Sequence, residues 1–156
     1  MQTRQPPVAV AEMLIRAPVG KVFAAMTDPE ITSKFWFSKG SGRLEAGAAV
    51  KWDWQPYGMS ADVEVTAFEP NRRVLFEWSN RDTPTTVEWL FTARSDGTTF
   101  VSVANWGFRG TNAAGQAIGS TEGFVLVLAG LKAFLEHGVE LNLVWDRFPD
   151  GIGGEA

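Results

Sequence analysis

The sequence contains no cysteine and only one histidine, His137. The absence of cysteine excludes disulfide bonds, thiol nucleophiles and thiolate metal ligands. A single histidine is too few for a histidine-rich zinc site. We therefore expect no bound metal, and no motif in the chain indicates another cofactor.

Positive charge is also scarce. The chain has 14 Lys and Arg against 18 Asp and Glu, and no basic cluster is longer than the pair Arg72-Arg73. Because nucleic-acid affinity depends on neutralising phosphates, a nucleic-acid partner is not expected. The N-terminal residues lack the long apolar run of a signal peptide, and no stretch is expected to span a membrane. We therefore expect a cytoplasmic protein.

Aromatic residues are abundant, and they are mostly Trp and Phe: the chain has seven Trp and eleven Phe but one Tyr. A buried Trp usually needs a partner for its indole N–H. Seven of them indicate either a roomy, ligand-binding interior or a tightly packed Trp-rich core, and composition leaves both open. The length of 156 residues fits one domain. We place this domain at residues 8–148, with 1–7 and 149–156 as flexible ends.

Hydrophobic periodicity predicts the order of the elements. Alternation predicts a strand over 8–17, and helical spacing predicts two short helices over 17–30 and 29–37. Five alternating stretches follow, joined by short turns: 48–54, 60–70, 72–78, 85–93 and 98–106. Such short turns predict an antiparallel meander. Apolar residues at helical spacing predict a long helix over 117–137. The tail is expected to dock through Val139, Leu141, Leu143 and Trp145.

This order resembles the helix-grip fold of the START-like, birch-pollen-allergen-like (SRPBCC) superfamily. The stretches "IRAPVGKVFAAMTDPEITSKFW", "VTAFEPNRRVLFEW", "TTVEWLFTARSDGTTFVSV" and "GFVLVLAGLKAFLEHG" are similar to those of the heat-shock-protein-90 ATPase activator homologues. The resemblance implies an α+β fold, with a curved antiparallel sheet wrapped around one long C-terminal helix and two short helices after the first strand. It also implies a hydrophobic cavity for an apolar ligand between sheet and helix. Chaperone-activating members carry a further domain, for which this chain has no room, so a chaperone partner is not expected.

Strand alternation points one set of aromatic side chains toward the long helix. The predicted ligand-binding residues are Trp52, Trp54, Phe76, Trp78, Trp89, Phe91, Phe124, Leu128 and Leu131. The alternative is that these side chains simply fill the core. The predicted pocket entrance comprises Phe35, Trp36, Phe37, Asn105 and Trp106. The first three of these could instead anchor the second short helix.

We predict no catalytic residue. Glu64, Glu77 and Glu88 alternate with the aromatic residues, which places them on the outer, solvated face of the sheet. His137 lies in the last turn of the predicted long helix, and Gly138 follows where a left-handed residue commonly ends a helix. A cation there suits the negative end of the helix dipole. His137 is therefore interpreted as part of a helix end.

Three functions remain open. The favoured one is a non-enzymatic domain that binds a small apolar or aromatic molecule between sheet and helix. The first alternative, which the resemblance implies, is a polyketide cyclase-like or hydrolase-like enzyme using the same cavity. It would need an inward-facing acid–base group, and the inward strand positions supply none. The second alternative is a protein-interaction module of the chaperone-activator type. Exposed meander edges would also allow a homodimer, which the sequence does not decide.

Overall fold

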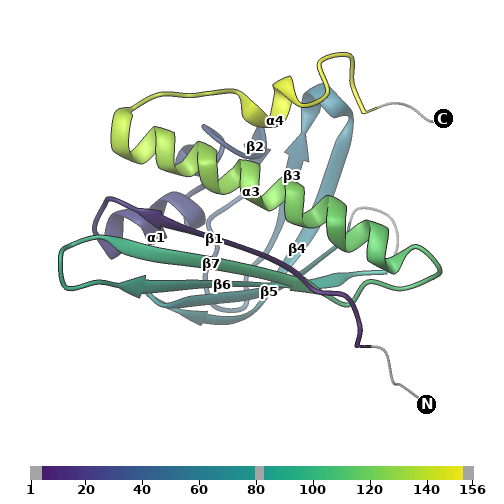
Figure 1. Cartoon of the computed structure of the whole chain (residues 1–156), viewed down its shortest axis with the longest axis horizontal. Helices are drawn as coiled ribbons and strands as arrows, with labels where there is room; N and C mark the ends of the chain where they lie inside the picture. The colour runs from purple at the N-terminus through teal and green to yellow at the C-terminus, as the bar shows by residue number, and fades with distance from the viewer. Residues whose placement is uncertain (1–4, 80–82, 153–156) are drawn as a thin grey trace.

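The computed structural model describes residues 5–79 and 83–152. Within these ranges the chain forms one seven-stranded sheet in the order β1-β7-β6-β5-β4-β3-β2, together with the helices that cover it (Figure 1). In chain order the elements are β1 (Ala9–Ile15), α1 (Val19–Thr27), α2 (Pro29–Thr32), β2 (Lys39–Gly40), β3 (Ala49–Trp54), the 3-10 helix η1 (Gln55–Tyr57), β4 (Met59–Glu69), β5 (Arg73–Ser79), β6 (Thr85–Ala93), β7 (Thr99–Trp106), α3 (Ala113–His137) and α4 (Leu143–Asp146).

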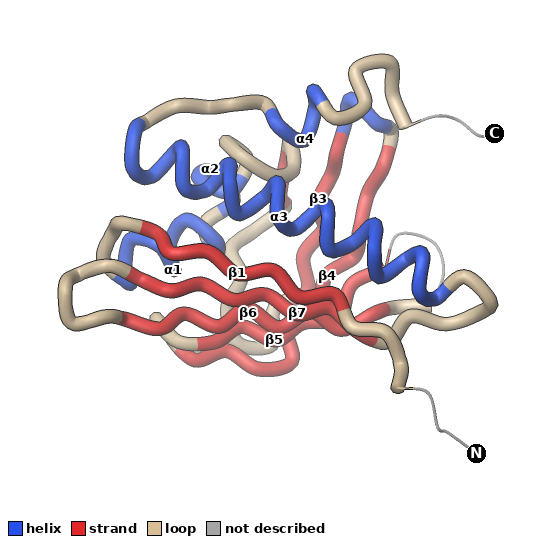
Figure 2. Tube along the Cα trace, viewed as in Figure 1, coloured by secondary structure: helices blue, strands red, loops and turns tan. Residues whose placement is uncertain are grey.

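The predicted α+β helix-grip fold is confirmed. The strands β3 to β7 form a continuous antiparallel meander, as their short connections require. The first strand lies beside the last, with Ala11 opposite Val103. One face of the sheet carries α3 across it, and the β3–β4 end rises beside the helix (Figures 1 and 2). The two-residue strand β2, which pairs with β3, has no periodic pattern and was not predicted.

The long helix is the centre of the core. It begins at Ala113, four residues before the predicted start, and buries Phe124, Val127, Leu128 and Leu131. By length and apolar composition alone, α3 reaches the range of a membrane-crossing helix. The apolar side chains on one side of α3 pack against the apolar concave face of the sheet, whereas Ile118 and Val125 on its other side are exposed.

Two short helices connect β1 to the meander. Pro18 precedes α1, whose residues Val22, Phe23 and Met26 are buried, as the predicted apolar stripe requires. The second helix is shorter than predicted because it ends at Thr32, and residues 33–37 follow it as turns. Phe35 lies against α3 at Gly130, where an added Cβ would come within 3.0 Å of the Phe35 Cβ. Gly130 therefore lets this segment approach the helix closely.

The end of α3 confirms the interpretation of His137. Gly138 adopts the left-handed conformation with φ of 66°, and its N–H donates to the Phe134 carbonyl at 2.9 Å. The His137 side chain is 72% exposed and lies 4.0 Å from the Glu136 carboxylate. His137 is thus the exposed last residue of α3, and the Gly138 backbone closes the helix end.

The tail docks differently from its prediction. Val139 and Leu141 are 44% and 45% exposed, whereas Val144 and Trp145 pack on the core. The hydroxyl of Tyr57 donates to the carbonyls of both Val144 and Trp145. The expected docking is confirmed for Trp145 and is wrong for Val139 and Leu141. Because α4 coils this part of the tail, its side chains do not alternate as those of an extended segment would.

The predicted domain limits, 8–148, stay a prediction. The predicted flexible ends lie partly outside the described residues, since 1–4 and 153–156 are not described. The described parts of these ends, 5–7 and 149–152, contain no helix or strand.

Glu136 joins the last turn of α3 to the end of β1. Its carboxylate accepts hydrogen bonds from the Arg16 backbone N–H and from Lys132 Nζ, both at 2.8 Å. The Lys132 ammonium also donates to the Leu14 carbonyl at 2.8 Å. Burial by itself would raise the pKa of Glu136. The hydrogen bonds from Lys132 and Arg16, with the charges of Lys132 and His137, outweigh burial and hold this pKa below its ordinary value of 4.5.

We expect this carboxylate to make stability fall with acidification. Because the folded-state pKa is depressed, its contribution is present above about pH 4.5 and is lost as pH falls through the folded-state pKa. The variant Glu136→Gln should be less stable than wild type at pH 7, by about 1–3 kcal/mol, and the difference should shrink below pH 4.5. Urea unfolding between pH 3 and pH 7 (about the range set by carboxyl titration) measures both effects. The exposed Glu45→Gln variant is the control, and an E136Q difference that does not change with pH would contradict the assignment.

Candidate functional site

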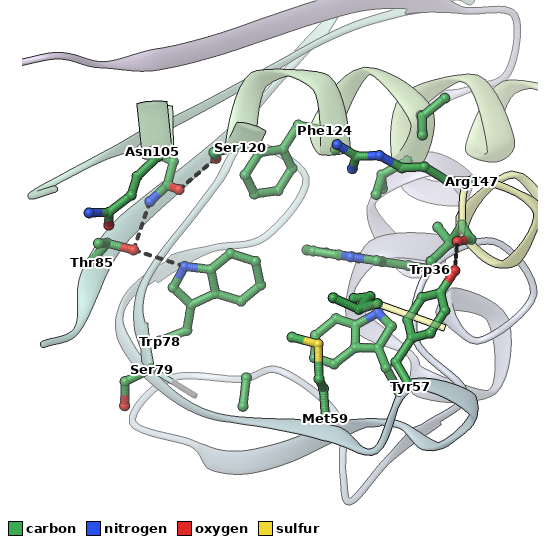
Figure 3. Close-up of a pocket in the computed structure, with 18 of the residues that line it drawn as sticks. Trp36, Tyr57, Met59, Trp78, Ser79, Thr85, Asn105, Ser120, Phe124 and Arg147 are labelled. Atoms are coloured by element: carbon green, nitrogen blue, oxygen red, sulfur yellow. Dashed lines mark hydrogen bonds between the residues drawn. The ribbon is translucent and has the colours of Figure 1, made fainter. Parts of the chain in front are cut away.

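A pocket of about 390 Å³ opens between α3, the tail and one end of the sheet (Figure 3). Its lining is mostly aromatic and aliphatic, with a smaller polar group. The aromatic residues are Trp36, Trp54, Tyr57, Trp78, Phe108, Phe124 and Phe148. The aliphatic residues are Met59, Ala61, Leu126, Val127, Val144 and Ile152, and Gly123 also contributes. The polar residues are Ser79, Thr83, Thr85, Asn105, Gln116, Ser120 and Arg147.

Antiparallel pairing brings the polar and aromatic groups together. Trp78, near the end of β5, is the register partner of Thr85 at the start of β6. Trp54 at the end of β3 is likewise the partner of Met59 at the start of β4. Each hairpin therefore delivers side chains from two strands to the same sheet end. The helix α3 crosses this end and closes the pocket from the other side (Figure 3).

Trp36, Trp54, Trp78 and Phe124 form one side of the pocket, which we call the aromatic wall. Trp36 contacts the other three rings. It is 5% exposed, and its ring centroid lies 6.4 Å from that of Trp54, 5.8 Å from Trp78 and 5.7 Å from Phe124. The rings of Trp78 and Phe124 stack on each other at 5.8 Å with an interplanar angle of 28°. These rings present apolar faces and edges, which suits the offset or edge-on packing of a flat aromatic molecule.

A hydrogen-bond network occupies one end of the pocket. Asn105, 1% exposed, donates through Nδ2 to the Thr86 carbonyl at 2.8 Å and to Thr85 Oγ1 at 3.0 Å. Its Oδ1 accepts from the Ser120 hydroxyl at 2.7 Å. Trp78 Nε1 also donates to Thr85 Oγ1, at 3.0 Å (Figure 3). The network ties β5, β6 and β7 to α3 and fixes the orientation of the Trp78 ring.

The tail supplies a different polar end. Arg147 pairs with the exposed Glu122 carboxylate, and its guanidinium carbon lies 4.9 Å from the Phe148 ring centroid. Burial raises the pKa of Tyr57 above its ordinary value of 10.0, and the nearby Asp146 charge acts in the same direction. The Phe148 backbone and the Arg147 charge lower this pKa by less. Tyr57 is therefore a neutral hydrogen-bond donor at neutral pH, directed at the tail.

Five of the predicted site residues line this pocket: Trp36, Trp54, Trp78, Asn105 and Phe124. Others lie in the packed core away from it: Trp52, Phe76, Trp89, Phe91, Leu128 and Leu131. Phe35 and Phe37 are also buried in that core without lining the pocket. Trp106 is half-buried and does not line it. A ligand-contact role for any of these residues stays a prediction.

The difference has a simple cause. Alternation determines which face of the sheet a side chain is on, but its place along the strand determines whether other side chains cover it. Trp52 is close to the middle of its strand and packs on Phe37 at 4.8 Å, whereas Trp54 ends that strand at the open side. Which positions along a strand are covered depends on tertiary packing, and the alternation of apolar and polar residues does not record it.

Sequence reasoning missed Thr85, Ser120, Tyr57 and Arg147. Thr85 continues the inward series of Val87, Trp89 and Phe91 at period two, so alternation could have found it. Ser120 precedes Phe124 by four residues and shares its helical face. Tyr57 and Arg147 come from a 3-10 turn and from the tail, where no periodic signal exists.

Titratable groups at the pocket are few. Within residues 5–79 and 83–152, no group of three His, Cys, Asp or Glu side chains could hold a metal ion. Glu64 and Glu77 are exposed register partners on the outer face, which confirms the predicted orientation. Glu88 pairs there with Arg73 at 2.6 Å. The described pocket lining contains Tyr57 and Arg147 as its ionisable groups.

A curved antiparallel sheet gripping a long C-terminal helix, with a pocket between them, defines a helix-grip protein. Residues 16–136 match the family described as activator of Hsp90 ATPase homolog 1-like protein, and the chain belongs to this family. No curated protein matches the chain.

Several solved structures share this fold. A protein from Staphylococcus saprophyticus is 30% identical over 86% of this chain and 95% of its own, with a TM-score of 0.74. DynU16, described as a putative protein in the dynemicin biosynthetic locus, is 26% identical, with a TM-score of 0.73. That match covers 86% of this chain but 49% of DynU16. The Aha1 dimer from Colwellia psychrerythraea is 21% identical over 84% of this chain and 97% of its own, with a TM-score of 0.73, and shows the fold alone.

Proposed function

We propose that this protein binds a small, flat, apolar molecule in the pocket between sheet and α3. The observation that carries the proposal is an aromatic-lined pocket of about 390 Å³ with a compact polar network at one end. Pockets for small organic ligands are typically of roughly 300–1,000 Å³ and apolar, with a few polar groups that fix orientation. Both features support a binding role.

Binding accounts for the lining better than catalysis does. A cyclase or hydrolase would need a group that gives or takes a proton near neutral pH. Tyr57 has a raised pKa and donates to the tail, and Arg147 is paired with Glu122. We therefore rank binding above the enzymatic alternative. The protein-interaction alternative lacks a comparable observation.

Two further predictions accompany this proposal. The first is that the protein is located in the cytoplasm. Homodimerisation stays a prediction, supported by the edge position of β1 and by Val8 and Val10, which are 51% and 50% exposed. The Aha1 protein from Colwellia psychrerythraea was solved as a dimer.

The neutral fluorescent probe N-phenyl-1-naphthylamine tests the proposal. We expect it to bind with a dissociation constant in the micromolar range, about −8 kcal/mol. Binding should quench tryptophan emission, because Trp36, Trp54 and Trp78 line the pocket. The variant Met59→Trp, which adds bulk to the lining, should weaken binding at least about tenfold, an effect of about 1.4 kcal/mol.

The matched control is Lys51→Trp, which adds the same side chain on the exposed outer face of β3. It should bind the probe as wild type does. If wild type binds neither this probe nor a panel of lipids, flavonoids and polyketide-like compounds, the binding proposal is wrong. Equal binding by Met59→Trp and wild type would place the ligand elsewhere.

A further inference from the structure

The hydroxyl of Thr85 is the centre of the polar end of the pocket. Its oxygen accepts two hydrogen bonds, from Trp78 Nε1 and from Asn105 Nδ2, both at 3.0 Å. A hydroxyl oxygen has two lone pairs and one proton. The two bonds use both lone pairs, so the proton has to be donated to a third group.

The direction of these bonds is fixed by their surroundings. The indole N–H can only donate. The Asn105 amide group faces the Thr86 carbonyl at 2.8 Å, and a carbonyl can only accept, so the atom facing it is the Nδ2 donor. The opposite amide atom, Oδ1, accepts from the Ser120 hydroxyl. Thr85 therefore cannot donate to either partner that contacts it.

Thr85 Oγ1 donates no hydrogen bond to any residue that the structure describes. Thr85 is half-buried and lines the pocket. Figure 3 shows its hydroxyl at the same end of the pocket as Trp78, Asn105 and Ser120. An unoccupied pocket would hold water there. A ligand that displaces this water without an acceptor leaves the donor unpaired, which costs affinity.

Building on the proposed binding function, we propose that Thr85 selects ligands whose flat aromatic body carries a carbonyl oxygen, and donates its hydroxyl proton to that oxygen. The ring of such a ligand would lie on the aromatic wall that includes Trp36. The ligand oxygen is neutral in this proposal. The cation of the lining, Arg147, extends from the tail to α3 and is paired with Glu122 rather than directed at Thr85 (Figure 3). A carboxylate beside Thr85 would lose its hydration without gaining a counter-charge.

Two matched probes test this selectivity: 2-acetylnaphthalene, which has the carbonyl, and 2-ethylnaphthalene, which has nearly the same shape without it. Hydrophobicity alone favours the ethyl compound. We expect wild type to bind the ketone roughly tenfold more tightly, because the unpaired donor penalises the ethyl compound. Tryptophan quenching titrations measure both dissociation constants.

Variants of Thr85 identify the donor. Thr85→Val keeps the shape and removes the hydroxyl, so the ketone preference should disappear while 2-ethylnaphthalene still binds. Thr85→Ser keeps the hydroxyl and should keep the preference. The readout is the ratio of two affinities on one variant, so a uniform loss of binding caused by weaker folding cancels. Thr85→Val also frees the Trp78 indole N–H, which donates to Thr85 in wild type, so the double variant Thr85→Val/Trp78→Phe is compared with Trp78→Phe alone. A ketone preference that persists in this double variant would overturn the assignment.

An infrared measurement on the wild-type protein tests the proposal even if the Thr85→Val variant does not fold. The carbonyl stretch of bound 2-acetylnaphthalene should shift to lower frequency, as a hydrogen-bonded ketone does, and an unshifted band would overturn the proposal. Equal binding of both probes by wild type would overturn the role of Thr85 and leave the binding function intact. Failure of both probes to bind would refute the binding function and this inference together.

Discussion

Replacing Trp36 with alanine is expected to lower the free energy of unfolding by about 3–5 kcal/mol and to enlarge the pocket. Trp36 is 5% exposed, and its ring contacts those of Trp52 at 5.0 Å and Trp89 at 5.9 Å, in addition to the rings that line the pocket. Its removal deletes contacts on the core side and leaves a void that opens into the pocket. Urea unfolding measures the first effect.

The pocket effect separates Trp36 from an ordinary core residue. Probe binding should shift toward a bulkier ring system, measured as the affinity of 1-phenylpyrene relative to N-phenyl-1-naphthylamine. Phe37→Ala is the matched control, since Phe37 is 1% exposed, packs in the same aromatic cluster and does not line the pocket. It should lose similar stability without the shift in ligand size.

Should Trp36→Ala be too unstable to purify, Trp36→Phe reduces the ring while keeping an aromatic contact. It should show both effects at smaller size. A Trp36→Ala protein with wild-type stability would show that the aromatic cluster is loosely packed. If Trp36→Ala and wild type have the same relative affinity for the two probes, the bound ligand does not contact Trp36.

The second large effect concerns Asn105. We expect Asn105→Leu to lower the free energy of unfolding by about 2–4 kcal/mol, because a buried amide with three partners is replaced by an apolar group of similar size. The Ser120 hydroxyl loses its acceptor, and Thr86 and Thr85 lose a shared donor. The cost arises from polar groups left unpaired rather than from lost volume.

Asn105→Asp tests the same point at constant shape. One carboxylate oxygen would face the Thr86 carbonyl, so burial and this contact should raise the pKa of the new carboxyl group. A raised folded-state pKa makes the variant relatively more stable below the unfolded value of about 3.9 and less stable as pH rises through the folded value. The stability difference from wild type should therefore be largest at neutral pH and smaller under acidic conditions.

Comparing each variant with wild type at the same pH removes the acid effect of Glu136 that all of them share. A substitution of Ser102 by alanine on the same strand, half-buried and without a side-chain hydrogen bond among the described residues, is the control. It should change stability by less than about 0.5 kcal/mol. An Asn105→Leu protein as stable as wild type would mean that water replaces the amide without cost.

The position of Asn105 also bears on specificity. The amide sets the direction of the Thr85 hydroxyl by supplying one of the two bonds that its oxygen accepts. A structural role and a recognition role therefore coincide in one network. Asn105→Leu should weaken the preference for the ketone probe as well as the fold, whereas a control mutation in the core should affect the fold alone.

Much of this architecture could be predicted from local patterns. Period-two alternation in Val74, Phe76 and Trp78 predicted the buried face of β5, and helical spacing predicted that Phe124 and Leu131 face the core. Gly138 and His137 marked the end of α3 through a local backbone preference. Each of these signals is determined by side chains within a few residues, so one sequence contains all of the information.

The site, by contrast, is formed by contacts between residues that lie far apart in the sequence. The pairing of β1 with β7, the fold-back of Arg147 and the docking of Tyr57 on the tail join residues far apart in the chain. Trp52 and Trp54 have the same periodic signal, yet Trp36 and Phe37 pack on the first, while the second borders the pocket. No local preference distinguishes them.

The sequence by itself determined the elements, their order, the inner and outer faces of the sheet and the end of the long helix. Tertiary structure alone decided where the sheet stays open, which aromatic side chains line the opening and that Thr85, Asn105 and Ser120 meet there. The physical reason is that periodicity records the direction of each side chain relative to its own backbone. An open volume and a shared hydrogen bond depend on the distances between backbones, which packing sets only when the whole chain has folded.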